Sequence, residues 1–164
     1  MRIVDLTTEV NYDYKTFLHR GLREQPEVFR ITEKDDRNLV FPTSGQQDSF
    51  TLGALSDQDE LLGVVSFARE GATREKLRHK GLLFRMYVTP ESSGQGIGSM
   101  LVQAVIDRAR RLPDIEQVNL TVIASNAPAR HLYSKFGFEV FSLEKHAVKY
   151  DGTYLDEETR VLFL

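Results

Sequence analysis

The chain has 164 residues, enough for one domain with a single hydrophobic core. Its 41% hydrophobic and 27% charged residues are typical of a globular protein and exclude a disordered or fibrous one. The net charge of −3 argues against a nucleic-acid partner, and the lack of cysteine excludes a disulfide framework, a thiolate nucleophile and a cysteine-ligated metal. The opening MRIVDL lacks the apolar core of a signal peptide, and no apolar run approaches the ~18 residues of a membrane span. We therefore expect a cytoplasmic protein with no membrane partner.

The first half of the chain predicts a strand, two helices and a hairpin. Helical spacing of apolar residues marks the first helix, and Pro26 ends it because the residue before a proline is biased away from helix. The hairpin consists of two apolar segments that flank SDQDE. In order, we expect a strand at 2–6, a helix at 11–25, a short helix within 31–40, a polar loop over 36–49, and strands at 50–55 and 61–69.

The second half predicts alternating strands and helices. We expect a buried strand at 82–89, a helix at 97–111, a strand at 117–123, a helix capped by Asn126, a hairpin at Asp151-Gly152 and a final strand at 160–164. Gly137 stands where a left-handed residue ends the second helix. The order predicts one mixed α/β domain over 1–164, with a largely antiparallel sheet flanked by helices. The strands at 82–89 and 117–123 would form its central parallel pair.

The segment TPESSGQGIGSM predicts an anion-binding loop. Gly94, Gly96 and Gly98 alternate immediately before the apolar stripe of a helix. A helix N-terminus presents unpaired N–H groups and a positive dipole end, and glycines leave those amides open. A Walker loop is excluded because Gly98 is followed by Ser99-Met100, and a dinucleotide fingerprint fits poorly because its sixth position is Ser99. A glycine-rich turn that merely reverses the chain remains the alternative.

Two segments together resemble the GCN5-related N-acetyltransferase (GNAT) family. YVTPESSGQGIGSMLVQAVIDRA is similar to the family's coenzyme A loop, Gln/Arg-x-x-Gly-x-Gly/Ala, which falls here on 93–98. NAPARHLYSKFGF, at 126–138, is similar to its later Asn-x-x-Ala-x-x-Leu-Tyr-x-x-x-Gly-Phe segment. LHRGLREQPEVF and EKHAVKYDGTYLDEETRVLFL also resemble one bacterial branch, so the likeness extends over most of the chain. The resemblance implies the GNAT-type acyl-CoA N-acyltransferase fold and an N-acetyltransferase that uses acetyl-CoA as co-substrate.

The resemblance also implies which residues bind the coenzyme. Main-chain N–H groups of the strand before the loop would hold the thioester carbonyl and the pantetheine arm, while the side chains pack in the core. Asn126 caps its helix and would also contact the pantetheine arm. The implied set is Met86, Tyr87, Val88, Ser93, Gly94, Gln95, Gly96, Ile97, Gly98, Ser99 and Asn126.

Ser93 departs from the family pattern, which has a Gln or Arg at this position. If backbone amides do most of the anion binding, the loss is tolerable. If the cation contributes, coenzyme affinity falls or a neighbouring cation replaces it. Arg130 and Lys135 are candidates for that replacement, and both also fit a solvated helix face.

Tyr133 is the catalytic candidate that the resemblance implies, as the acid that meets the leaving thiolate. Helical spacing places it on the inner face with Ala129 and Phe136, where a tyrosine also serves as core. Transfer of a proton from a phenol (pKa ~10) to a thiolate (~8.5) is uphill by roughly 2 kcal/mol. Tyr133 would therefore either donate a proton or only hydrogen-bond the developing thiolate.

The sequence leaves the general base and the acceptor open. The amine must lose a proton to a carboxylate, a histidine or a water chain, and Glu70, Glu75, His79 and Glu144 are candidates that also fit a surface. The basic run REKLRHK at 74–80 would meet the coenzyme's 3′-phosphate or an acidic substrate, or form a solvated loop. No metal site is expected, because the histidines show no ligand spacing: His19, His79, His131 and His146.

The expected reaction is direct transfer in a ternary complex to the primary amine of a small molecule, peptide or protein terminus. Without cysteine, no acyl-cysteine intermediate forms. The alternative is a non-catalytic acyl-CoA-binding sensor that keeps the loop without productive acceptor geometry. We expect a monomer or a homodimer, since the final strand offers an edge for a second copy.

Overall fold

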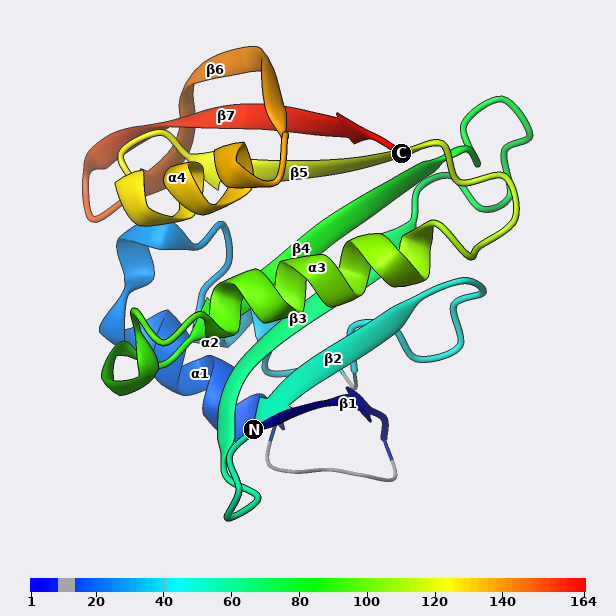
Figure 1. Ribbon diagram of the computed structural model, residues 1–164. Coiled ribbons are helices and arrows are strands. Elements are labelled where there is room, and N and C mark those ends of the chain that lie inside the picture. Colours follow the sequence, from blue (N-terminus) through cyan, green and yellow to red (C-terminus); the bar gives the residue numbers. More distant parts are fainter. Residues whose placement is uncertain (9–13, 40) are drawn as a thin grey trace.

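The computed structural model describes residues 1–8, 14–39 and 41–164, and these form one sheet with helices on both faces (Figure 1). The elements are, in order, β1 (Arg2–Leu6), α1 (Tyr14–Glu24), η1 (Pro26–Val28), α2 (Glu33–Asp36), β2 (Phe50–Leu55), β3 (Leu61–Arg69), β4 (Lys80–Val88), η2 (Pro90–Ser92), α3 (Ile97–Ala109), β5 (Gln117–Ile123), α4 (Ala127–Lys135), β6 (Glu139–Tyr150) and β7 (Thr153–Phe163).

Within the described residues, the sheet runs in the order β1-β2-β3-β4-β5-β7-β6. Its neighbours pair antiparallel except β4 and β5, which are parallel and are joined through α3. The predicted mixed α/β class and its central parallel pair are thus confirmed. The pairing of β4 with β5 extends only from Lys80↔Gln117 to Leu82↔Asn119. Beyond Leu82 the two strands separate, and their facing edges are left unpaired with each other (Figure 1).

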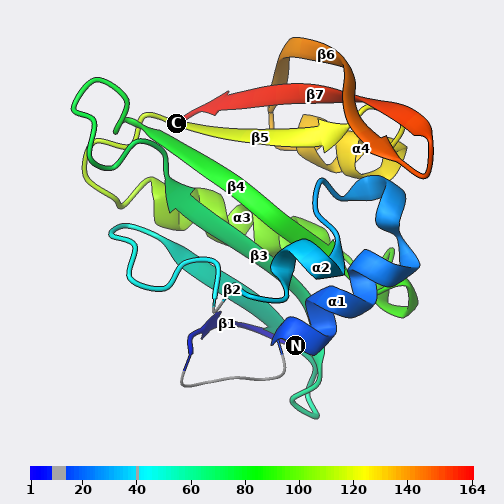
Figure 2. The same ribbon diagram turned by 180° about the vertical axis from the view of Figure 1, so that it is seen from behind.

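The helices cover the sheet from opposite sides. α3 and α4 lie on one face (Figure 1), and α1 and α2 lie on the other (Figure 2). On the first face, the α3 stripe that includes Ile97, Leu101 and Val105 is fully buried in the main core. On the second face, Leu18 of α1 packs in a smaller cluster that includes Tyr87 of β4. β4 is therefore held between the two layers along its length.

The predicted turns and helix boundaries largely hold. Asp151 and Gly152 have φ of 45° and 77°, as a two-residue hairpin turn requires, and Gly137 has φ of 86° after α4. The short helix predicted within 31–40 is confined to α2, Glu33–Asp36, and is capped by Thr32. α1 begins at Tyr14, and residues 11–13 of the predicted helix lie outside the described residues.

The final strand is longer than predicted. β7 spans Thr153–Phe163 rather than 160–164 alone, and it pairs with both β5 and β6. Its first half carries the acidic residues of LDEET, which period-two apolar patterning does not mark as a strand. No helix of the described segments combines the length and the apolar character that crossing a membrane requires.

Candidate functional site

A cavity of about 1000 Å³ opens where β4 and β5 separate. Residues of both strands form its walls, the start of α3 and one face of α4 close one side, and the segment 28–31 around the end of η1 lies on the other. The separation of β4 from β5 creates this site, because the edge of each strand that lacks a partner exposes main-chain N–H and C=O groups to the cavity.

The glycine loop forms one end of the cavity. Gly94 and Gly96 have φ of 79° and 80°, and a Cβ built on either residue would meet no atom within 4 Å. Gly96 is the N-cap of α3 and offers no side-chain cap, so the first amides of the helix have no side-chain partner there. The conformation requires glycine, and the open space beside it fits a ligand that reaches the amides directly.

Gly98 has a different role in the same motif. It lies within α3, and a Cβ at this position would stand 3.1 Å from Leu132 Cδ2 and 3.3 Å from Met86 Cε. Its lack of a side chain therefore allows α3, α4 and β4 to approach closely. Of the remaining loop residues, Ser93, Ile97 and Ser99 also line the cavity.

Gln95 is the predicted loop residue that does not line the cavity. Its Nε2 donates to the main-chain oxygen of Glu91, at 3.3 Å, on the outside of the loop. The other predicted coenzyme residues, including Asn126, all contribute to the cavity wall. Asn126 also caps α4, because its Oδ1 accepts a hydrogen bond of 3.2 Å from the amide of Ala129.

Met86, Tyr87 and Val88 form the β4 wall, and their side chains leave the strand in alternate directions. The Tyr87 ring packs on the α1 side, with its centroid 5.2 Å from that of Phe17. Met86 lies on the α4 side, near Gly98. All three line the cavity while their side chains pack.

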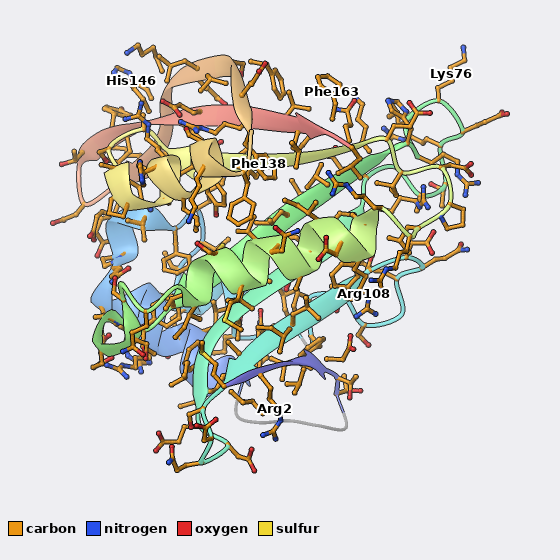
Figure 3. The ribbon with its side chains drawn as sticks, viewed as in Figure 1. Arg2, Lys76, Arg108, Phe138, His146 and Phe163 are labelled. Atoms are coloured by element: carbon orange, nitrogen blue, oxygen red, sulfur yellow. The ribbon has the colours of Figure 1, made fainter. Side chains whose placement is uncertain are left out.

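Tyr133 of α4 points into the cavity toward β4. Its side chain is 6% exposed, and its hydroxyl donates to Met86 Sδ at 3.5 Å. Figure 3 shows Phe138 beside α4, and its ring lies edge-on to that of Tyr133 at 5.8 Å. Burial raises the pKa of Tyr133 well above its ordinary value, although Arg160 lowers it. The phenol therefore stays protonated and acts as a hydrogen-bond donor.

The structure places the predicted base candidates outside this cavity. Glu70, Glu75 and His79 lie in the connection between β3 and β4, and the Nδ2 of Asn119 donates to Glu70 at 3.0 Å. Figure 3 shows Lys76 of the basic run at the tip of this connection, pointing away from the molecule. This end of β4 is opposite to the glycine loop. Glu144 is exposed on β6 and likewise does not line the cavity.

The two candidate replacement cations differ. Lys135, at the end of α4, lines the cavity. Arg130 is instead engaged by Glu158, 3.0 Å away, and does not contribute to the wall. Of these two candidates, Lys135 is therefore the one that lies at the cavity.

Glu157 of β7 is a site residue that the sequence did not reveal. It lines the cavity, is 3% exposed, and its Oε2 has no hydrogen-bond partner among the described residues, although Arg30 Nε lies 2.9 Å away. Burial raises the pKa of Glu157, and the nearby charge of Glu144 raises it further, while Arg30 and a hydrogen bond with Thr121 lower it. Glu157 pairs with Ile123, the last residue of β5, so it lies beside the region where β4 and β5 separate.

Arg85 is a charged residue of the β4 wall. It has φ of 51° beside an irregularity in the β3–β4 register, and its Nη1 donates to the buried carboxylate of Asp36. Asp36 is also 2.9 Å from His19 Nε2. The guanidinium of Arg85 is thus neutralised within the protein. In the described residues, no group of three or more His, Cys, Asp or Glu side chains is placed to hold a metal ion.

The two central strands of the sheet separate, and the N-terminus of α3, which has no side-chain cap, lies where they part. This arrangement is that of the acyltransferase fold class. Sequence comparison identifies the family within that class: the model for the "Acetyltransferase (GNAT) family" matches residues 14–138. The chain belongs to the GNAT family of acetyltransferases.

Among curated relatives, mycothiol acetyltransferase of Propionibacterium freudenreichii is 30% identical over 141 residues, which are 85% of this chain and 42% of that protein. The L-amino acid N-acetyltransferase AaaT of Escherichia coli is 30% identical over 73 residues, 44% of this chain and 45% of that one. The matches thus span less than half the length of these relatives.

Solved structures share the whole fold. An acetyltransferase of the GNAT family from Streptococcus pneumoniae has a TM-score of 0.85 at 20% identity and covers 99% of both chains. The yncA protein of Salmonella typhimurium, solved with its cofactor acetyl-CoA, has a TM-score of 0.82 at 20% identity, over 99% of this chain and 93% of that one.

Proposed function

We propose that this protein is an N-acetyltransferase that moves the acetyl group of acetyl-CoA to a primary amine by direct attack in a ternary complex. The observation that carries the proposal is that one cavity joins the open amides at Gly94 and Gly96 to the hydroxyl of Tyr133. The family supports an acyl-CoA co-substrate, and the yncA structure contains acetyl-CoA. Relatives named as an L-amino acid N-acetyltransferase and an N-alpha-acetyltransferase support an amine acceptor.

The residues present fit the coenzyme. Its diphosphate would lie against the amides at the start of α3, in the space that a Cβ on Gly94 or Gly96 would fill. The pantetheine arm would follow the free edge of β4 past Met86, whose neighbours offer main-chain hydrogen bonds. Asn126 and Ser93 complete the wall, and Lys135 supplies the nearby positive charge.

The thioester supplies an activated acyl carbon, and the chain supplies the surroundings in which an amine attacks it. As the carbon–nitrogen bond forms, amides of the free β4 edge stabilise the charge on the carbonyl oxygen. As the carbon–sulfur bond breaks, the Tyr133 hydroxyl donates a hydrogen bond to the sulfur. Its raised pKa makes full proton transfer from the phenol less favourable, so solvent protonates the thiolate after release.

Incubation with acetyl-CoA and a panel of primary amines tests the proposal, with free thiol release and product mass as readouts. We expect turnover on at least one class of amine. Binding of coenzyme A without turnover on any amine would instead support an acyl-CoA-binding sensor.

Tyr133→Phe tests the proposed role of the hydroxyl. The variant should bind coenzyme A nearly as well as the wild type but turn over much more slowly, because only the contact with the sulfur is removed. Unchanged turnover would exclude Tyr133 from the mechanism.

A further inference from the structure

The basic and acidic side chains that line the cavity are few and unequal. They are Arg30, Arg85, His131, Lys135 and Glu157. Arg85 is already paired with buried Asp36, and Lys135, at the end of α4, is itself a cation. Among the lining residues, Glu157 is the one carboxylate. A primary amine enters as an ammonium ion at neutral pH, so Glu157 is the group in this wall that attracts it.

Glu157 and Arg30 differ in how strongly the fold fixes their side chains. Glu157 belongs to β7, which pairs on both sides within the sheet, and its side chain is almost completely buried. Arg30 lies between η1 and α2, and its side chain is 58% exposed. An exposed guanidinium leaves an ion pair at little cost because water replaces its partner. The acceptor would therefore displace Arg30 while Glu157 stays in place.

We propose, on the basis of the function proposed above, that Glu157 and Arg30 form an acceptor subsite for a free α-amino acid or a similarly short zwitterion. Glu157 binds the ammonium group, and Arg30 turns to the carboxylate. The geometry favours a short ligand: Arg30 starts in contact with Glu157, at 2.9 Å, and needs to turn only slightly to meet a carboxylate that is a few bonds from the ammonium group. A guanidinium also matches a carboxylate with two parallel N–H donors.

The same carboxylate then serves the chemistry. Once Arg30 has turned to the ligand's carboxylate, Oε2 of Glu157 keeps no hydrogen-bond partner among the described residues, so a lone pair is available to take a proton from the bound ammonium. The neutral amine attacks the acetyl carbon, and the carbon–sulfur bond breaks with its electrons on sulfur. The attacking nitrogen loses its second proton to solvent as the amide forms, and the first proton stays on Glu157 until solvent removes it. The groups that face Glu157 are Arg30, Thr121 and Glu144, and its raised pKa makes it a better proton acceptor than an ordinary glutamate.

Arg30→Gln tests the substrate class. The assay compares the common L-amino acids with their α-amides, which keep the amine and lose the carboxylate. We expect Arg30→Gln to raise the KM for the best amino acid about tenfold, as loss of one charge-assisted contact would. It should leave the KM for the matching amide unchanged.

Arg23→Gln is the matched control, because Arg23 is an exposed arginine of α1 that pairs with Glu33 and does not line the cavity. It should behave as wild type with both substrates. Equal loss on amino acids and amides in Arg30→Gln, or wild-type preference for amides or peptides over free amino acids, would overturn the proposed subsite.

Glu157→Gln tests the carboxylate. Turnover should fall at least 100-fold, within the range for loss of a general base, while the affinity for coenzyme A stays unchanged and shows that the variant is folded. Glu144→Gln, the cross-strand neighbour outside the cavity, should keep wild-type turnover at its plateau pH.

The two proposals fail in different ways. If the wild type acetylates no amine, the proposed function fails. If it acetylates amines and Glu157→Gln does so equally well, only the acceptor subsite fails.

Discussion

Gly96→Ala separates the effect of the loop on stability from its effect on coenzyme binding. Gly96 has φ of 80°, and its Cβ would meet no atom within 4 Å, so the substitution creates backbone strain without a clash. A left-handed conformation costs an L-residue about 1–2 kcal/mol. For a chain of this size that loss lowers the melting temperature by about 2–8 °C.

The same methyl group would stand between the ligand and the amides of α3. If it removes one hydrogen bond to a charged diphosphate, worth about 1.5–3 kcal/mol, the dissociation constant of coenzyme A rises about 10- to 100-fold. Isothermal titration calorimetry measures this effect, and thermal unfolding without ligand measures the strain.

Gly152→Ala provides the control. Gly152 has φ of 77° and equally open surroundings, but it lies in the β6–β7 turn and does not line the cavity. It should lose similar stability and bind coenzyme A as the wild type does. If Gly96→Ala lost stability like this control but kept full coenzyme affinity, the amides at the start of α3 would not bind the diphosphate.

Three further substitutions test packing, charge and pH dependence. Gly81→Ala would place a Cβ 2.2 Å from the Phe67 ring, which is fully buried, so we expect a loss of about 3 kcal/mol in chemical denaturation; a loss under 1 kcal/mol would contradict this packing. Lys135→Gln should weaken coenzyme A about fivefold in low salt and less in high salt, and an unchanged affinity would exclude Lys135 as the replacement cation. Because burial raises the pKa of Glu157, turnover should fall with decreasing pH at a value above the ~4.3 of a free glutamate. Glu144→Gln removes a like charge and should move that limb to lower pH, and a limb that stays in place would argue against Glu157 as the titrating group.

The geometry of the glycine-loop end of the cavity could be predicted because its signals are local. The apolar stripe of α3 starts directly after Gly96, and helix N-termini and left-handed glycines depend on residues a few positions apart. Asn126 and Gly137 marked both ends of α4 for the same reason, and this placed Tyr133 on its buried face. Gly98 was assigned to the loop, whereas the structure gives it a packing role that depends on Leu132 of another helix.

The acceptor end could not be predicted because its contacts are distant in the sequence. Glu157 meets Arg30, and neither residue has a local pattern that sets it apart from its charged neighbours. Period-two apolar patterning failed over LDEET because the inward position of this part of β7 is a carboxylate. The base candidates Glu70 and His79 were expected near the edge of a cleft, but they lie at the end of β4 away from the cavity.

The two ends of the cavity therefore rest on different parts of the molecule. Gly96 and Gly98 belong to the helix whose buried face joins the main core, so changes there affect folding together with coenzyme binding. Arg30 lies on a half-exposed connection outside the sheet, where substitution leaves the core intact. Substitution of Glu157 should affect folding differently from both. Burial of its carboxylate lowers the stability of the fold, and a neutral glutamine would remove that cost. If Glu157 and Arg30 form the proposed acceptor subsite, substitution of Arg30 should change acceptor choice without loss of coenzyme binding, whereas Glu157→Gln should leave a stable, coenzyme-binding protein that transfers acetyl groups far more slowly.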